Sequence, residues 1–257
     1  MPPTEPWPIP RTHPPLSDEE IHVWRAPLQI PPSEQLKVQG FLAEQERERA
    51  NRFQFPQHQQ HFIAARGILR MLLAHYLQQP PRQIPLQYNQ YGKPSLALSD
   101  PLRFNLSHSG EMALYAFSRN RELGVDIEWT QRRLEDEEQI AKRFFSPREA
   151  DTLLRLPAPV RKTAFFDCWT RKEAYIKAYG KGLSIPLNQF EVTLVPGEVA
   201  RLQTITGDPT HWTIQPLTPG DKYTAALVVE GAGWEVKCWT VDFPSHPSRN
   251  WEAQKKS

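Results

Sequence analysis

The chain has 257 residues, of which 39% are hydrophobic and 23% are charged, and its formal net charge is +2. This composition is typical of a globular protein, and the small net charge disfavours a nucleic-acid partner. The two cysteines, Cys168 and Cys238, form neither a metal-ligand pattern nor a disulfide framework, which favours a reducing, cytoplasmic compartment. The N-terminus has no signal-peptide pattern, and no apolar stretch is long enough to predict a membrane span.

Proline-rich residues 1–19 are predicted to form an irregular tail. The N-terminal lobe, expected over 20–118, contains a predicted strand, two helical regions and three further strands. In chain order these elements are expected at 20–26, 34–52, 57–77, 84–88, 102–108 and 112–118. The helix predicted over 57–77 carries a strong apolar stripe and ends at Pro80 and Pro81.

The C-terminal lobe, expected over 119–244, repeats this order of parts, and residues 245–257 are predicted to be a loose tail. A strand is predicted at 123–129, followed by a helix at 134–145, a second helix that begins at Ser146-Pro147, and a long helix at 159–179. The remaining strands are expected at 189–195, 212–216, 223–229 and 234–242.

A weak internal repeat favours two similar lobes. Each long helix is followed by a similar tetrapeptide, IPLQ at 84–87 and IPLN at 185–188. The predicted fold class is therefore α/β (α+β), with two lobes related by a pseudo-two-fold axis, each a small sheet packed on a long helix. Ligand sites commonly lie in the cleft between such lobes.

Two carboxylates share one face of the strand predicted at 123–129. Side chains alternate along a strand, so Asp126 and Glu128 point to the same side, where they can chelate a hard divalent cation. The other interpretation is a half-buried strand with a solvated polar face, and for this stretch alone it is the more common one.

The segment WTRKEAYIKAYGKGL (169–183) places Glu173 and Lys177 four residues apart on one helix face. Such a pair contributes only about 0.2–0.5 kcal/mol to a helix and alone needs no functional explanation. The other basic residues fit a solvated face; they are Arg171, Lys172 and Lys181. The glycines that follow the helix allow a ligand to approach the backbone.

Further polar residues lie where predicted strands or helices meet turns. His108, in NLSHSG (105–110), can donate to a phosphate, although a lone histidine more often bonds to neighbouring backbone. No G-x-S-x-G elbow surrounds its flanking serines, which disfavours acyl-enzyme chemistry. Arg66 lies beside small helix residues, and Lys93 lies in the YGKP turn.

Taken together, the motifs GKP (92–94), FNLSHSG (104–110), GVDIE (124–128) and WTRKEAYIKAYGKGL (169–183) resemble the Sfp-type 4′-phosphopantetheinyl transferases of the holo-[acyl-carrier-protein] synthase superfamily. The resemblance covers about residues 40–195, and the chain fits every position of the last motif. Tyr88 and Glu46 stand where some family members have basic residues.

The resemblance implies an enzyme that transfers the 4′-phosphopantetheine arm of coenzyme A to a serine of an apo acyl or peptidyl carrier protein. The other product is adenosine 3′,5′-bisphosphate. The implied metal is Mg²⁺, replaceable by Mn²⁺, with Asp126, Glu128 and Glu173 as ligands. Glu173 is also the implied base, and Lys177 neutralises the phosphate being transferred. The implied coenzyme A contacts are Arg49, Arg66, Gly92, Lys93, Pro94, Ser107 and His108.

The implied partners are coenzyme A and an acidic carrier protein, and the implied enzyme is a cytoplasmic monomer with no membrane or nucleic-acid partner. Fatty-acid, polyketide and nonribosomal-peptide carriers all remain open as the natural substrate. The residues expected to meet the carrier are Arg132, Arg133, Leu134, Lys142, Arg143 and Lys181.

Other functions fit the same residues less well. A Mg²⁺-dependent phosphodiesterase or nuclease would need a broadly positive groove, which the net charge of +2 disfavours. A non-catalytic module that binds coenzyme A or carriers would not need the complete set of Asp126, Glu128, Glu173 and Lys177. A purely structural protein requires all four motifs to be coincidences at the family's spacing.

Overall fold

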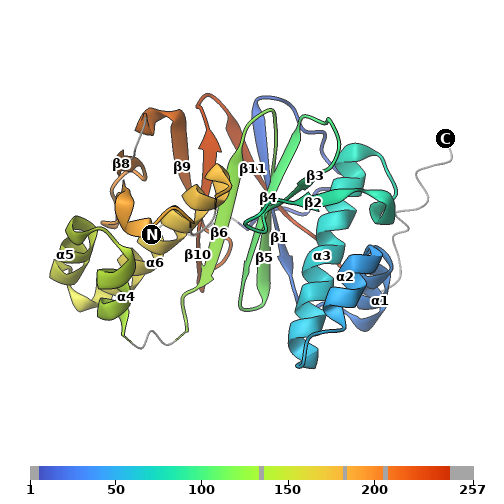
Figure 1. Ribbon diagram of the computed structural model, residues 1–257, viewed down its shortest axis with the longest axis horizontal. Helices are drawn as coiled ribbons and strands as arrows, with labels where there is room; N and C mark the ends of the chain where they lie inside the picture. The colour runs from blue at the N-terminus through green and yellow to red at the C-terminus, as the bar shows by residue number, and fades with distance from the viewer. Residues whose placement is uncertain (1–5, 133–135, 182–183, 205–207, 244–257) are drawn as a thin grey trace.

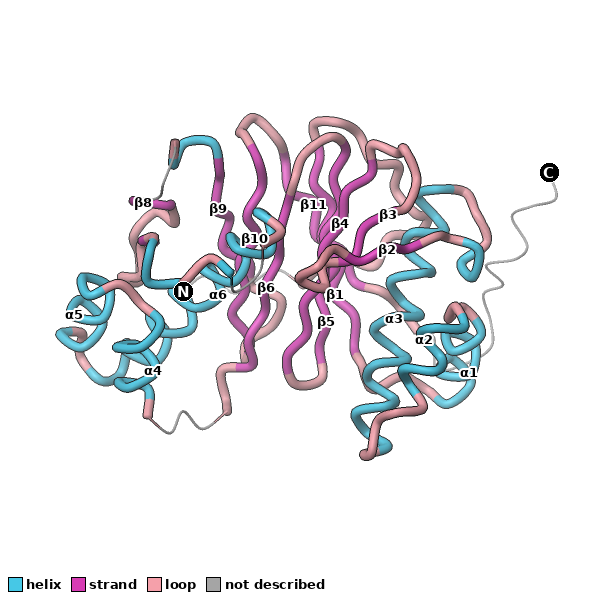
Figure 2. The backbone as a smooth tube through the Cα atoms, viewed as in Figure 1, coloured by secondary structure: helices cyan, strands magenta, loops and turns pink. Residues whose placement is uncertain are grey.

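The structure is a computed structural model that describes residues 6–132, 136–181, 184–204 and 208–243 (Figure 1). Two long helices, α3 (Pro56–Leu77) and α6 (Ala158–Tyr179), lie on opposite flanks. Two sheets fill the middle, so the order across the protein is helix, sheet, sheet, helix (Figure 2). The predicted mixed α/β fold is confirmed, whereas the pseudo-two-fold relation between the halves stays a prediction.

The first half is built on a four-stranded sheet in the order β11–β1–β5–β4. Strands β1 (Glu20–Pro27), β4 (Leu102–Ser109) and β5 (Met112–Arg119) match the predicted strands, and β5 pairs antiparallel with both of the others. β11 (Glu235–Thr240), from the range expected to form the second lobe, pairs parallel with β1. The C-terminal strand therefore completes the sheet of the first half.

The helical region predicted over 34–52 is not continuous. It forms α1 (Pro32–Gly40) and α2 (Glu44–Ala50), and the chain turns between them. Leu42, within the turn, is fully buried with the residues that pack against α3. Burial of this one apolar side chain in a charged segment explains why the chain leaves the helix there.

The second half has a three-stranded antiparallel sheet covered by α6. In sheet order its strands are β6 (Leu123–Trp129), β10 (Tyr223–Glu230) and β9 (Trp212–Leu217). Helices α4 (Glu137–Phe144) and α5 (Pro147–Arg155) precede α6. α5 begins where Ser146-Pro147 predicts, because the Ser146 side chain accepts from Glu149 N while the Glu149 carboxylate accepts from Ser146 N.

The remaining regular elements are short. β2 (Leu86–Tyr88) pairs with β3 (Pro94–Leu96), and β7 (Glu191–Val192) pairs with β8 (Leu202–Thr204). The 3₁₀ turns are Pro81–Gln83, Leu187–Gln189 and Pro209–His211. The strands predicted at 84–88 and 189–195 are thus too long, and β3 and β8 were not expected. Periodicity over so few residues does not distinguish a strand from a turn.

An apolar core joins the two sheets face to face. Alternate residues of β5 divide between the layers: Leu114 and Ala116 face the second sheet, whereas Tyr115 and Phe117 pack towards α3. Val125 of β6 and Leu227 of β10 meet the first pair in the shared core. Because both faces of the central strands are buried, the halves form one packed body.

Residues 6–19 contain no helix or strand, which agrees with the predicted irregular tail, but they are packed on the protein. Trp7 is buried in the core between the sheets. Its carbonyl accepts from Thr240 Oγ1 at 2.7 Å, and Thr240 N donates to Pro8 O at 2.9 Å. The predicted tail at 245–257 lies outside the described residues, and no helix within the described ranges is long and apolar enough to cross a bilayer.

A glycine lets α6 lie directly on β6. A Cβ added to Gly124 would stand 2.1 Å from Ala174 O and 2.3 Å from Ala178 N, both backbone atoms of α6. Only a residue without a side chain permits this approach. The contact matters for the site because Lys177 and Glu173 belong to the same stretch of α6.

Gly124→Ala is expected to destabilise the protein by about 1–3 kcal/mol or more, because neither helix nor strand backbone can yield locally. Thermal unfolding checks this against Gly40→Ala, where the added Cβ meets nothing within 4 Å. The control should be neutral or stabilising by up to about 1 kcal/mol. Equal melting temperatures for the two variants would contradict the close packing of α6 on β6.

Candidate active site

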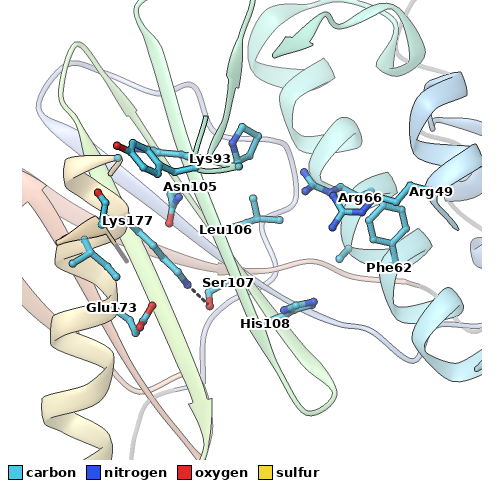
Figure 3. Close-up of a pocket in the computed structure, with 17 residues that line it drawn as sticks. Arg49, Phe62, Arg66, Lys93, Asn105, Leu106, Ser107, His108, Glu173 and Lys177 are labelled. Carbon is cyan, nitrogen blue, oxygen red and sulfur yellow. Dashed lines mark hydrogen bonds between the residues drawn. The ribbon is translucent and has the colours of Figure 1, made fainter. Parts of the chain in front are cut away.

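A cleft of about 680 Å³ lies between the two halves (Figure 3), a volume typical of small-molecule sites. One wall is formed by α3, β4 and the turn between β2 and β3, and the other by the C-terminal part of α6. The site residues predicted from the sequence that line it are Arg49, Arg66, Gly92, Lys93, Pro94, Ser107, His108, Glu173 and Lys177.

Side chains of β4 join the two sheets along the floor of the cleft. Buried Asn105 accepts from Val125 N at 2.9 Å. Ser109 Oγ donates to Glu128 Oε2 at 2.9 Å and accepts from Trp129 N at 3.0 Å. Every second residue of β4 therefore binds β6, and this seam holds Asp126 and Glu128 beside the cleft.

Ser107, Asp126 and Lys177 form a closed triangle of hydrogen bonds at the centre of the site. Lys177 Nζ lies 2.6 Å from Asp126 Oδ1 and 2.8 Å from Ser107 Oγ, and Ser107 Oγ donates to Asp126 Oδ1 at 2.8 Å. Asp126 is 5% exposed, and its second oxygen, Oδ2, is buried with no hydrogen-bond partner among the described residues. An orphaned carboxylate oxygen in such a place can accept a donor or bind a cation.

Glu173, one turn before Lys177, completes a cluster of acids. Burial raises its pKa to about 7, and the negative charges of Asp126 and Glu128 add to the shift although Lys177 opposes it. Burial and Asp126 also raise the pKa of Glu128. The negative charge of Asp126 thus disfavours ionisation of both Glu128 and Glu173, an arrangement that favours either proton transfer or cation binding near neutral pH.

Positive groups occupy the opposite wall. The guanidinium carbons of Arg49 and Arg66 lie 5.2 Å and 5.9 Å from the centre of the Phe62 ring, and Arg66 also lies 5.6 Å from the Tyr88 ring. Arg66 Nη1 is buried and has no hydrogen-bond partner in the described parts of the chain. Figure 3 shows His108 on this side of the cleft, across from Glu173 and Lys177.

The surroundings of His108 favour binding of an anion. Burial against the cleft wall and the nearby charges of Lys177 and Arg66 lower the pKa of His108. An anionic ligand would oppose that shift by adding negative charge. A ligand with phosphates at both ends would therefore meet arginines and histidine at one wall and Lys177 at the other.

Comparison with known proteins identifies the family. Residues 30–120 match the family model described as 4′-phosphopantetheinyl transferase, N-terminal, and residues 122–228 match the 4′-phosphopantetheinyl transferase superfamily. The 4′-phosphopantetheinyl transferase HetI of Nostoc is 43% identical over 87% of this chain and 93% of its own length. The chain belongs to the 4′-phosphopantetheinyl transferase family.

Two further relatives agree with this assignment. A putative 4′-phosphopantetheinyl transferase of Synechocystis, slr0495, is 38% identical over 70% of this chain and 74% of its own length. The Sfp transferase of Bacillus subtilis is 30% identical over 72% of this chain and 82% of its own length. The solved holo-[acyl-carrier-protein] synthase of Thermotoga maritima covers 43% of this chain and 62% of its own at a TM-score of 0.33 and 23% identity.

The transferase contains no group of three or more His, Cys, Asp or Glu side chains arranged to hold a metal, as far as the structure describes the chain. Lys177 is paired with Asp126, and Arg132 Nη2 lies 3.3 Å from Glu128 Oε1. The raised pKa values of Glu128 and Glu173, and the Asp126 Oδ2 atom without a partner among the described residues, nevertheless suit a Mg²⁺ ion, which binds few carboxylates and keeps several waters.

Two basic residues of α6 are not on a solvated face, contrary to the expectation from the sequence. Lys172 is 0% exposed, and its ammonium lies 2.7 Å from Glu149 Oε2 and 2.7 Å from Leu187 O. Arg171 is 5% exposed and donates to Thr193 O. Arg171 also lies 3.6 Å from Asp167, one helical turn earlier, but the partners named above are 15 to 23 residues away in the chain, so helical spacing alone does not reveal them.

Two polar residues at the site were missed by the sequence analysis, Asn105 and Ser109. They share the period of two with Ser107, so all three point to one side of β4. This alternation of polar residues in NLSHS indicates that one face of β4 makes polar contacts with a neighbouring strand instead of facing solvent.

Proposed function

We propose that this transferase moves the 4′-phosphopantetheine arm of coenzyme A to a serine of an apo acyl or peptidyl carrier protein in a Mg²⁺-dependent reaction. The observation that supports this most is the position of Glu173, with its raised pKa, and Lys177 on one wall of the cleft, across from two arginines and a histidine. Such a cleft suits a nucleotide that carries both a 3′-phosphate and a pyrophosphate.

In this proposal the positive wall binds the 3′-phosphate. Arg66 has a donor with no partner among the described residues, Arg49 lies over the same Phe62 ring as Arg66, and His108 opens to the cleft. Arginine binds phosphate through fixed, paired donors, which also orients the nucleotide. The pyrophosphate would then lie towards Lys177.

Glu173 takes the proton of the attacking serine. The serine oxygen forms a bond to the phosphorus that carries the pantetheine arm, while the bond from that phosphorus to the oxygen of adenosine 3′,5′-bisphosphate breaks. A carboxylate whose pKa lies near 7 is well matched to accept a proton at neutral pH. Lys177 stabilises the charge that develops on the phosphate oxygens.

Asp126, Glu128 and Glu173 would hold the Mg²⁺ ion, which supplies neutralisation of the phosphate charge when bound. For this role Asp126 would contribute its Oδ2 atom, which has no partner among the described residues. Glu128 would give up its contact with Arg132 in order to bind the ion. Release of Lys177 from Asp126 would leave its ammonium for the phosphate.

In this proposal an acidic carrier would meet basic residues of α4, of the segment after β6 and of the end of α6. Lys142 and Arg132 expose 59% and 41% of their side chains, Arg143 lies 5.2 Å from the Phe144 ring centre, and Lys181 lies 5.1 Å from the Tyr179 ring centre. Arg133 and Leu134 lie outside the described residues. These charges would mainly speed the encounter. The proposal includes a monomeric enzyme. It also places the enzyme in the cytoplasm, a reducing compartment that fits the two free cysteines.

The decisive experiment incubates the protein with coenzyme A, Mg²⁺ and apo carriers of the fatty-acid, polyketide and nonribosomal-peptide types. We expect the mass of at least one carrier to rise by one phosphopantetheine arm, and a Ser→Ala carrier to stay unchanged. Lack of any mass increase across all carriers, with folded enzyme, would overturn the proposal. Replacing Mg²⁺ by a chelator tests the metal separately.

The stability of the metal-free protein should depend on the ionisation of Glu173. Its pKa is about 7 when folded against an ordinary 4.5, so between these values the folded state holds a proton that the unfolded state has lost. The free energy of unfolding therefore falls as pH rises through this window, by about 1–3 kcal/mol from this group.

Urea unfolding in the presence of a chelator, at several pH values, measures this for the wild type and Glu173→Gln. Subtracting one curve from the other removes the contribution of the histidines His13, His22 and His75. Their pKa values are lowered by folding, so they make the free energy of unfolding rise with pH. Parallel curves for the two proteins would contradict the raised pKa.

A further inference from the structure

The turn between β2 and β3 is shaped by one asparagine. Asn89 Oδ1 accepts from Tyr91 N at 2.9 Å and from Lys93 N at 3.0 Å, and Asn89 N donates to Lys93 O at 3.1 Å. Gly92 supplies the positive φ of 85° that the turn requires. These bonds fix the amide of Asn89, because its oxygen faces two N–H donors and its nitrogen must point away.

The outward side of this turn holds the end of α6, across the junction between the two halves. Asn89 Nδ2 donates to Gly180 O at 2.6 Å. Lys93 Nζ donates to Ala178 O at 3.2 Å, to Leu123 O at 3.4 Å and to Glu122 Oε2 at 3.1 Å. A single turn of the first half thus binds the last carbonyls of α6 and the start of β6 in the second half.

These contacts match the needs of a helix C-terminus. The last carbonyls of a helix have no partner within it, and they attract a cation through the helix dipole. α6 ends at Tyr179, and the residue that caps it, Gly180, has a φ of +80° and donates its N–H to Ile176 O at 3.0 Å. Lys93 and Asn89 approach within 3.6 Å and 3.9 Å of the position that a Cβ on Gly180 would take.

The ammonium of Lys93 has three partners in this contact, although the sequence predicts that it binds coenzyme A. Lys93 lines the cleft, but its Nζ points to carbonyls and a carboxylate of the other half. Its side chain is 18% exposed. By contrast, Arg66 of α3, on the same wall of the cleft, keeps a donor without a partner among the described residues.

We propose that Asn89 and Lys93 form an inter-lobe latch that positions the end of α6, and that Lys93 acts as a positioning residue and not as a contact to the nucleotide phosphates. The latch acts on Lys177 and Glu173 through the last turns of the helix that carries them. For its effect on catalysis, the proposal rests on the proposed transferase function.

Asn89→Asp tests the latch most sharply. The substitution keeps the oxygen that accepts from Tyr91 N and Lys93 N but removes the donor to Gly180 O, and it places a negative charge against that carbonyl. Asn188→Asp, at an exposed position of the 3₁₀ turn Leu187–Gln189 that does not line the cleft, makes the same chemical change elsewhere. Lys93→Met removes the ammonium, and Lys93→Arg restores a cationic donor.

Three measurements on the full chain separate a latch from a ligand contact. In the ligand-free protein, hydrogen exchange of amides 178–180 should speed up about tenfold or more in Asn89→Asp and Lys93→Met, because each loses at least one hydrogen bond. Calorimetric Kd values for adenosine 3′,5′-bisphosphate should stay within about twofold of the wild type, since the latch touches no phosphate. In the transfer assay kcat should fall about tenfold with an unchanged KM for coenzyme A, and Lys93→Arg should recover most of it.

The opposite pattern would overturn the proposal. If Lys93→Met weakens bisphosphate binding tenfold or more while exchange at 178–180 stays at the wild-type rate, Lys93 is a phosphate contact. Wild-type exchange and kcat in Asn89→Asp, equal to those of Asn188→Asp, would show that no latch operates. If the wild type transfers nothing to any carrier, the proposed function fails, while the exchange and binding measurements still decide the latch.

Discussion

Glu173→Gln is expected to reduce kcat for carrier modification by a factor of about 10²–10⁴, because it removes the base and weakens one metal ligand together. The fold should persist, because glutamine has the shape of glutamate and lacks the negative charge that the surroundings of Glu173 disfavour. Burial and the charges of Asp126 and Glu128 oppose ionisation of Glu173, so the neutral variant should be at least as stable above pH 7.

Single-turnover measurements of carrier mass, with melting curves of both proteins, check this expectation. Glu198→Gln makes the same change at an exposed position away from the cleft and should leave the rate unchanged. Nearly full activity of Glu173→Gln would show that the residue is neither the base nor a required ligand. A loss of activity accompanied by unfolding would contradict the expected stability.

Lys172→Met should produce the largest loss of stability, about 3–5 kcal/mol, because it leaves a buried carboxylate without its cation. Glu149 is 3% exposed and also accepts from Ser146 N and Val192 N, so it cannot turn to solvent without breaking those bonds. Leu187 O would lose its donor as well. Methionine preserves most of the buried volume, so the effect measures the lost charge pairing.

Urea unfolding of Lys172→Met and of Lys142→Met tests this expectation. Lys142 pairs with Glu138 on the surface of α4, where both side chains are more than half exposed. Solvent and salt screen such an exposed pair, so the control should barely change. A similar, small loss in both variants would mean that the buried pair of Lys172 and Glu149 does not hold α6 to α5.

The sequence pattern predicted those helices and strand faces that are determined by residues close together in the chain. The helices at 57–77 and 159–179 follow from apolar spacing and from proline and glycine at their ends, and the structure has them almost at those bounds. Asp126 and Glu128 point to one side because strand geometry alone requires it, and Glu173 and Lys177 share a helix face for a similar reason. In the folded protein Glu173 and Lys177 line the cleft, and Ser107 and Ser109 hold Asp126 and Glu128 beside it.

The tertiary structure decided everything that depends on distant partners. The helical spacing of Lys172 is that of a surface lysine, but in the structure its ammonium contacts Glu149 and Leu187 O. The GKP motif predicts that Lys93 binds the ligand, but in the structure its ammonium donates to Ala178 O at the end of α6. The sequence by itself predicted which residues would carry the chemistry, and it determined which faces of helix and strand they occupy. Only the packed structure decided which charges are free for a ligand, because burial and hydrogen-bond partners come from segments far away in the chain.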